Sequence, residues 1–213
     1  MKLATSKIKG TSFFQCLDWC PDEKNLFHIV DKASGKPLHG SHKLLSNEAF
    51  FFLNFINSYE DGQNIIIDLI GYDSPDILKQ MFLEKLRNGL LETKDKSKIM
   101  RFVIPRNIDG SVGDDLLKDS GNSAQAVMGK KKVILHPHLV CQDQGCEHPS
   151  INRNVQGRKY KYSYVIGYLE SVNKLPFANA VSKVDMDNGH VQAWKGDEFT
   201  HPVSRLTFTC AYM

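Results

Sequence analysis

Side chains that bind transition metals gather in one short stretch, residues 136–148. The potential ligands there are His136, His138, Cys141, Cys146 and His148. Thiolates and imidazoles hold Zn²⁺ in tetrahedral sites, although four residues between the two cysteines is a wide spacing for such a site. The stretch therefore predicts, as one alternative, a small β protein that is stabilised by zinc.

The other cysteines and histidines are interpreted as structural or surface residues. Cys16 and Cys20 are read as ordinary thiols, and His28, which has apolar neighbours on both sides, is read as a strand residue. Turn-like sequence surrounds four further histidines, which predicts that they face solvent. These four are His39, His42, His190 and His201.

A second stretch of interest consists of two apolar runs, Phe50–Ile56 and Gln63–Ile70, which flank the turn Glu60-Asp61-Gly62. Asp-Gly supplies the positive φ angles that a tight hairpin turn needs. The runs are rich in Phe and Ile, which is typical of core strands. The sequence therefore predicts a β-hairpin, and the polar residue Asn54 lies within its first strand.

Short apolar segments bounded by turn residues recur along the whole chain and indicate an all-β protein. The predicted strands are Ser12–Leu17, Leu26–Asp31, Phe50–Ile56, Gln63–Ile70, Met100–Ile104, Lys132–Leu135, Tyr160–Tyr168, Ala180–Asp185, Val191–Trp194 and Leu206–Tyr212. An Asn-Gly turn at residues 188–189 predicts a second hairpin. Strands of this kind fit a β-propeller or a β-sandwich equally well on physical grounds.

Two segments interrupt the strand pattern. One predicted helix begins after Ser74 as N-cap and Pro75 at its first position, and it ends at Gly89. Its predicted apolar face consists of Leu78, Met81, Phe82 and Leu86. Residues 107–131 are rich in Gly, Ser and Asp without periodicity, which predicts a loop or insertion.

Composition excludes some classes of function. Hydrophobic residues make up 41% and charged residues 24% of the 213 residues, as in ordinary soluble proteins. A net charge of +3 is too small to indicate a nucleic-acid partner. An odd number of cysteines, five, favours reduced thiols in a cytoplasmic protein.

Membrane association is predicted only at the surface, if at all. No run approaches the roughly 18 apolar residues of a membrane span, and the first ten residues lack the apolar core of a secretory signal. Phe13, Phe14 and Trp19 lie near Lys7 and Lys9 in the sequence. These side chains fit either a peripheral contact with a membrane or simple core packing.

Six segments in the same order resemble the carotenoid cleavage oxygenases, that is, the carotene dioxygenases and the retinoid isomerases related to them. The first two are residues 2–12 and 26–32, followed by the central hairpin with its helix. The others are Arg101–Pro105, Cys146–Asn152 with Gly157–Tyr162, and Val181–Asp185 with Trp194. The resemblance covers nearly the whole chain.

The resemblance implies a seven-bladed β-propeller of which residues 1–213 form an internal part, roughly three to four blades with one inserted helix, incomplete at both ends. It also implies oxidative cleavage of a carotenoid double bond, with O2 and an Fe(II) ion on four histidines, to give retinal or apocarotenals. Neutral imidazoles suit Fe(II), and an apolar tunnel suits the carotenoid or retinoid.

At two positions the resemblance bears on the iron site. Asn54 stands where the family has an iron-binding histidine, and Glu147 stands where the family has a glutamate that orients such an imidazole. An amide oxygen is a weak ligand that suits Ca²⁺ better than Fe(II). The other three ligand positions fall outside the chain, and Pro202–Arg205 replaces a second orienting glutamate.

The expectation for this chain is therefore that it binds little or no iron and has no turnover of its own, with no catalytic residue or metal ligand assigned. Glu147 keeps the position of the orienting glutamate but has no visible imidazole to orient, and the alternative is a carboxylate that bonds to nearby backbone or faces solvent. An alternative function is a non-catalytic module that binds a lipophile or another protein.

Overall fold

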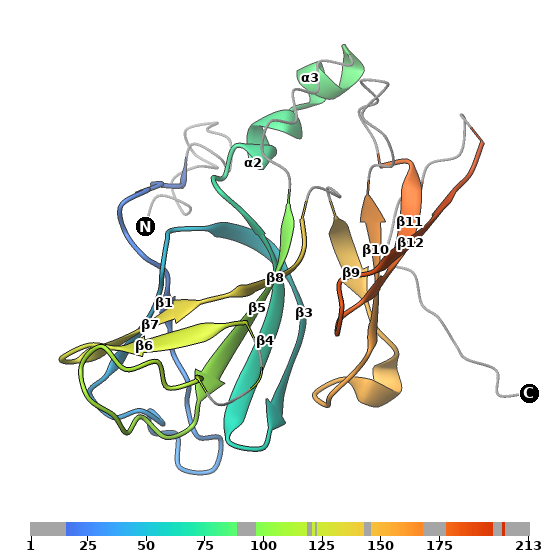
Figure 1. Cartoon of the computed structure of the whole chain (residues 1–213). Coiled ribbons are helices and arrows are strands. Elements are labelled where there is room, and N and C mark those ends of the chain that lie inside the picture. Colours follow the sequence, from blue (N-terminus) through green and yellow to red (C-terminus); the bar gives the residue numbers. More distant parts are fainter. Residues whose placement is uncertain are drawn as a thin grey trace, which may run out of the picture.

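The described strands form three four-stranded sheets, which lie side by side in Figure 1. The structure is a computed structural model that describes residues 16–88, 97–118, 121, 123–142, 146–167, 178–197 and 202. The predicted all-β class is confirmed within these residues, where helices are few and short. Propeller closure and the number of blades remain predictions.

The sheets are described by their strands in spatial order. The first contains β1 (Leu26–Phe27), β2 (Lys43–Ser46), β7 (Lys132–His136) and β6 (Gln125–Met128). The second contains β3 (Phe51–Asp61), β4 (Asn64–Tyr72), β5 (Lys98–Pro105) and β8 (His138–Cys141). The third contains β9 (Glu147–Ser150), β10 (Tyr162–Gly167), β11 (Ala180–Asp185) and β12 (Val191–Lys195), listed from one edge to the other.

Both hairpins predicted from turn chemistry are confirmed. β3 and β4 pair antiparallel down to the turn, where Gly62 adopts a φ of +58°. β11 and β12 also pair antiparallel, and the turn between them contains Gly189 at a φ of +73°. Positive φ is cheap only for glycine, so these two residues fix where the chain reverses. β3 is longer than predicted because its pairing continues through Asp61.

Four strands were not predicted: β2, β6, β8 and β9. β6 lies inside residues 107–131, so that segment is not a loop throughout, because Gln125–Met128 pairs antiparallel with β7. β2 pairs with β7 in parallel, a contact between segments that are far apart in the sequence. These strands have only four residues each and carry no clear alternation.

The single helix predicted after Ser74 is wrong in detail. Two short helices stand in its place, α2 (Ile77–Gln80) and α3 (Leu83–Arg87), and Asp76 is the N-cap of α2. Met81, the C-cap residue of α2, has φ −81° and ψ 0°, which ends the helical backbone there. Met81, Phe82 and Leu83 are exposed rather than buried along one face.

An aromatic cluster joins the first two sheets. The Phe102 ring on β5 is fully buried and lies 4.8 Å from the Phe27 ring on β1 and 5.4 Å from the Phe50 ring, measured between centroids. Such close ring contacts contribute more than their buried area alone. The first sheet is thereby held against β5.

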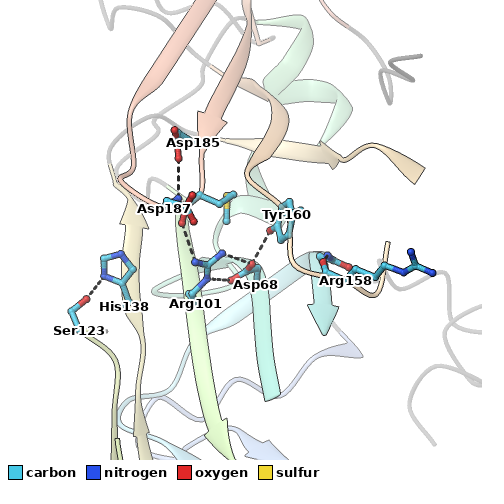
Figure 2. A network of polar contacts seen from close by, with 10 residues as sticks. Asp68, Arg101, Ser123, His138, Arg158, Tyr160, Asp185 and Asp187 are labelled. Carbon is cyan, nitrogen blue, oxygen red and sulfur yellow. Dashed lines mark hydrogen bonds and ion pairs between the residues drawn. The ribbon is translucent and has the colours of Figure 1, made fainter. Parts of the chain in front are cut away.

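A buried polar network joins the second and third sheets (Figure 2). Asp68 on β4 has no exposed surface, and its carboxylate accepts two hydrogen bonds from Arg101 on β5, at 2.8 and 2.9 Å. The Tyr160 hydroxyl, ahead of β10, donates to the same carboxylate at 2.7 Å. Arg101 also donates to the carbonyl oxygen of Met186, just after β11, at 3.0 Å.

A second clamp lies near the turn of the β3–β4 hairpin. The Asn57 side chain accepts a hydrogen bond from the Gly157 N–H at 3.0 Å and donates to the Arg158 carbonyl oxygen at 3.0 Å. These partners follow the 3₁₀ helix η2 (Arg153–Val155), which leads into the third sheet. The third sheet is therefore fixed to β3 as well as to β4 and β5.

No helix in the described part of the chain is long and apolar enough to cross a membrane. Several predictions lie outside the described residues, namely most of the strand Ser12–Leu17, the strand Leu206–Tyr212, the side chains of Phe13, Phe14, Lys7, Lys9 and Leu86, and His201 and Gly89. Trp19 is half-buried.

Candidate functional site

The two residues singled out by the resemblance lie together. β3 is an edge strand of the second sheet and β9 an edge strand of the third, and the two strands contact each other. Asn54 on β3 donates a hydrogen bond from Nδ2 to Oε2 of Glu147, the first residue of β9, at 2.7 Å. The site is thus assembled from segments 93 positions apart in the sequence.

Two further donors hold the Glu147 carboxylate. The hydroxyl of Tyr72, at the end of β4, donates to Oε1, and the backbone N–H of His148 donates to Oε2 at 3.2 Å. Tyr72 is buried, whereas Glu147 and Asn54 are half-buried. Both carboxylate oxygens therefore have uncharged donors, and the position of the side chain is fixed from three strands.

Irregular pairing of β3 shapes the surface around Asn54. The register between β3 and β4 shifts between Phe52 and Asn54, and again between Phe55 and Asn57. Bulges of this kind re-aim side chains. Phe52, Leu53 and Phe55 are 36%, 38% and 58% exposed, and the two Phe rings meet edge to face with their centroids 5.0 Å apart.

Apolar side chains exposed side by side are less common on a protein surface than single exposed ones. We call Phe52, Leu53 and Phe55 the β3 strip. Residues of the β3 strip precede and follow Asn54 in the sequence, so the polar pair Asn54–Glu147 lies next to an apolar surface.

Iron does not fit the side chain at position 54. The amide nitrogen of Asn54 donates a hydrogen bond to Glu147, so a metal ion could bind this side chain only through its neutral carbonyl oxygen. Fe(II) in oxygenases is held by imidazoles and carboxylates, and an amide oxygen is a weak substitute. No chemical step is therefore derived through a metal at this position.

The zinc alternative is not supported by the geometry either. Among the residues that the structure describes, no group of three or more His, Cys, Asp or Glu side chains could hold a metal ion. His136 ends β7 and His138 begins β8. The His138 ring is hydrogen-bonded through Nδ1 to the Ser123 hydroxyl (Figure 2). Burial lowers the pKa of His138, and the positive charge of Arg101 lowers it further.

One surface prediction for the histidines is wrong. His39 is buried, because its Nε2 is hydrogen-bonded to the Pro105 carbonyl oxygen at 2.7 Å at the end of β5. His42 is half-buried, and His190 is exposed as predicted. His28 is exposed and lies just beyond β1 rather than within a strand.

Comparison with known proteins identifies the family. The model of the family described as retinal pigment epithelial membrane protein matches residues 1–206. The chain belongs to this family, that of the carotenoid oxygenases. The resemblance stated from the sequence is confirmed.

Curated relatives in the carotenoid oxygenase family include two dioxygenases. The mitochondrial carotenoid-cleaving dioxygenase of Macaca fascicularis is 32% identical over 213 residues, which cover 93% of this chain and 37% of the relative. The β,β-carotene 15,15′-dioxygenase of Gallus gallus is 29% identical and covers 92% of this chain and 37% of the relative. The chain thus spans a little over a third of the length of these relatives.

Two solved structures illustrate the fold that the chain shares with known proteins. Cobalt-substituted apocarotenoid oxygenase of Synechocystis is 19% identical, with a TM-score of 0.58 over 85% of this chain and 31% of that one. The lignostilbene dioxygenase of Pseudomonas brassicacearum is 16% identical, with a TM-score of 0.59 over 92% of this chain and 36% of that one. At these identities the likeness shows the fold.

Tyr72 is the member of the site that sequence reasoning missed. Its position at the end of an apolar strand carries no polar pattern, and only the contact with Glu147 reveals its role. Asn57 was missed for the same reason, since its partners lie in a distant turn.

Proposed function

We propose that this chain forms blades of a carotenoid-oxygenase propeller and presents the β3 strip to a long apolar polyene, a carotenoid or retinoid. In the whole protein the reaction would be O2-dependent cleavage of a carotenoid double bond, with Fe(II) held by histidines. The described residues of this chain would supply the apolar contact and the Asn54–Glu147 pair but no iron ligand at position 54.

The observation that carries the proposal is the pairing of Asn54 with Glu147. A hydrogen bond of 2.7 Å joins a position at which the family resemblance places an iron-binding side chain and a position at which it places a carboxylate that orients such a side chain. The carboxylate therefore orients the side chain at position 54 even though that side chain is an amide. The exposed rings of Phe52 and Phe55 then supply an apolar surface beside it.

Binding and turnover can be separated in one experiment. Purified protein would be mixed with β-carotene or an apocarotenal in detergent micelles, with Fe(II) and O2, and followed by the visible absorbance of the polyene and by chromatography of products. We expect a shifted absorbance that co-elutes with the protein, without cleavage products, and no stoichiometric, chelator-resistant iron in elemental analysis.

A matched pair of variants tests the surface. Phe55→Asp places a charge in the β3 strip and should weaken polyene binding roughly tenfold or more, because an exposed aromatic contact is replaced by a solvated carboxylate. Val112→Asp changes another exposed apolar residue, 65% exposed, and should leave binding unchanged, because its neighbour Gly113 is hydrogen-bonded to Met128 of β6 in the first sheet. Equal binding by Phe55→Asp and the parent chain would contradict the assignment of the strip.

A peripheral contact with a membrane is favoured by a separate observation. Met81, Phe82 and Leu83 are 51%, 41% and 60% exposed where α2 ends and α3 begins. Basic residues lie in the last turns of both helices, and that of α2, Lys79, forms an ion pair with Asp76 at 2.7 Å. Exposed apolar side chains flanked by cations are typical of interfacial helices. We expect the protein to float with anionic phospholipid vesicles, and Phe82→Asp to reduce that fraction severalfold.

A further inference from the structure

Two buried cysteines lie at the passage from the second sheet to the third. Cys141 ends β8 and Cys146 directly precedes β9, and they are 8% and 2% exposed. Neither takes part in the function proposed above. Both belong to the same hydrophobic core.

Backbone contacts place the two cysteines against one end of β5. Cys141 pairs with Ile99 in the register of β5 and β8. The carbonyl oxygen of Cys146 accepts a hydrogen bond of 2.6 Å from the hydroxyl of Ser97, which lies two residues before Ile99. Cys141, at the end of β8, and Cys146, just before β9, therefore both lie against the same end of β5.

The side chains meet at this place. Interaction with the Cys141 thiol, together with burial, raises the pKa of Cys146, and the Cys141 thiol donates to the Gln142 carbonyl oxygen at 3.9 Å. Two buried cysteines whose backbones lie against the same end of β5 need little movement to form a covalent bond. Pairs of this kind react with each other in preference to external thiols because the second thiol is already in place.

We propose that Cys141 and Cys146 are a redox-sensitive pair, which hydrogen peroxide or glutathione disulfide converts to a disulfide that ties β8 to β9. With peroxide, one thiol is oxidised to a sulfenic acid and one water is released. The second thiol then attacks the sulfenic sulfur, and a second water leaves. The two thiols lose two protons and two electrons in total, and one peroxide is reduced to two waters.

Burial sets the rate of this reaction. The thiolate is the attacking species, so a buried thiol with a raised pKa reacts slowly at neutral pH and faster as the pH rises. The exposed Cys20 should be modified first. Because Cys146 is the neighbour of Glu147, the bond would also fix the start of the strand that carries the candidate site.

Peptide mass mapping of the intact, folded protein tests the pair directly. Both cysteines fall in one tryptic peptide, Val133–Arg153. After reduction, removal of reductant and exposure to glutathione disulfide or peroxide, the protein would be unfolded in iodoacetamide and digested. We expect this peptide to be lighter by two hydrogens and to carry no alkyl group, and the thermal midpoint of the oxidised protein to rise by about 5 °C.

Variants serve as controls, and the parent chain alone decides the result. Cys20→Ser should leave the internal disulfide intact, whereas Cys141→Ala should leave Cys146 open to alkylation on unfolding. The proposal is overturned if, after prolonged oxidation at pH 8.5, both cysteines of the peptide take up iodoacetamide. It is equally overturned if they carry two separate glutathione adducts or a bond to Cys20.

Discussion

The buried ion pair between Asp68 and Arg101 offers the sharpest test of how the sheets are held together. Replacing Arg101 by Met removes two hydrogen bonds, of 2.8 and 2.9 Å, from a carboxylate that has no exposed surface. The Tyr160 hydroxyl stays as a donor to it. Breaking one side of a buried pair leaves an uncompensated charge, which costs about 3–5 kcal/mol.

A loss of this size in the free energy of unfolding can be measured by urea denaturation. For a chain of this length the free energy of unfolding falls by about 3 kcal/mol for each molar unit of urea. Arg101→Met should therefore lower the urea midpoint, followed by circular dichroism, by more than about 1 M. The bond from Arg101 to the Met186 carbonyl adds to the loss, since it joins the second sheet to the third.

A surface ion pair supplies the matched control. Lys159 lies 3.0 Å from Asp61, but the two side chains are 69% and 46% exposed. Solvent screens such pairs, so Lys159→Met should move the midpoint by less than about 0.3 M. The double variant Asp68→Leu/Arg101→Met, which removes both charges, should recover much of the loss. A midpoint for Arg101→Met no lower than that of Lys159→Met would refute the reasoning.

Three substitutions on β3 test the fold and the site at other points. Burial raises the pKa of Tyr59 to about 12, so the neutral phenol stabilises the fold below pH 10. This contribution is lost as the pH rises from 10 to 12. In alkaline denaturation, Tyr59→Phe should therefore reduce the fall in the free energy of unfolding over that range. Asn57→Ala removes two part-buried hydrogen bonds to backbone groups of the exposed Gly157 and Arg158. The loss should cost about 1–2 kcal/mol in urea unfolding, and an unchanged midpoint would speak against the clamp. Asn54→His alone should give no carotenal products with Fe(II) and O2, because one imidazole does not make a metal site; measurable product by chromatography would overturn that expectation.

Local chemistry explains which parts of the fold could be predicted from the sequence. The hairpins of β3–β4 and β11–β12 are encoded by Asp-Gly and Asn-Gly turns, whose backbone requirements do not depend on the rest of the chain. β9 is different, because Glu147–Ser150 contains a proline and no apolar alternation. It is a strand only because it lies at a sheet edge against β10, where a proline is tolerated.

Two members of the candidate site, Asn54 and Glu147, were predictable from the sequence, but their contacts were not. The family resemblance marked Asn54 and Glu147 separately, and nothing in the sequence joins two residues on strands of different sheets. Tyr72 and Asn57 depend in the same way on tertiary packing. The predicted helix failed because hydrophobic spacing favours a continuous helix, whereas the backbone at Met81 interrupts it.

The amide at position 54 gives the junction of β3 and β9 a hydrogen-bond donor that does not titrate. An imidazole there would change its charge near pH 6.5, and its bond to a carboxylate would strengthen or weaken with the compartment. The Asn54 side chain keeps both amide hydrogens and no charge throughout that range. The side chain at position 54 therefore presents the same hydrogen-bond donor to Glu147 in a mildly acidic compartment as in a neutral one.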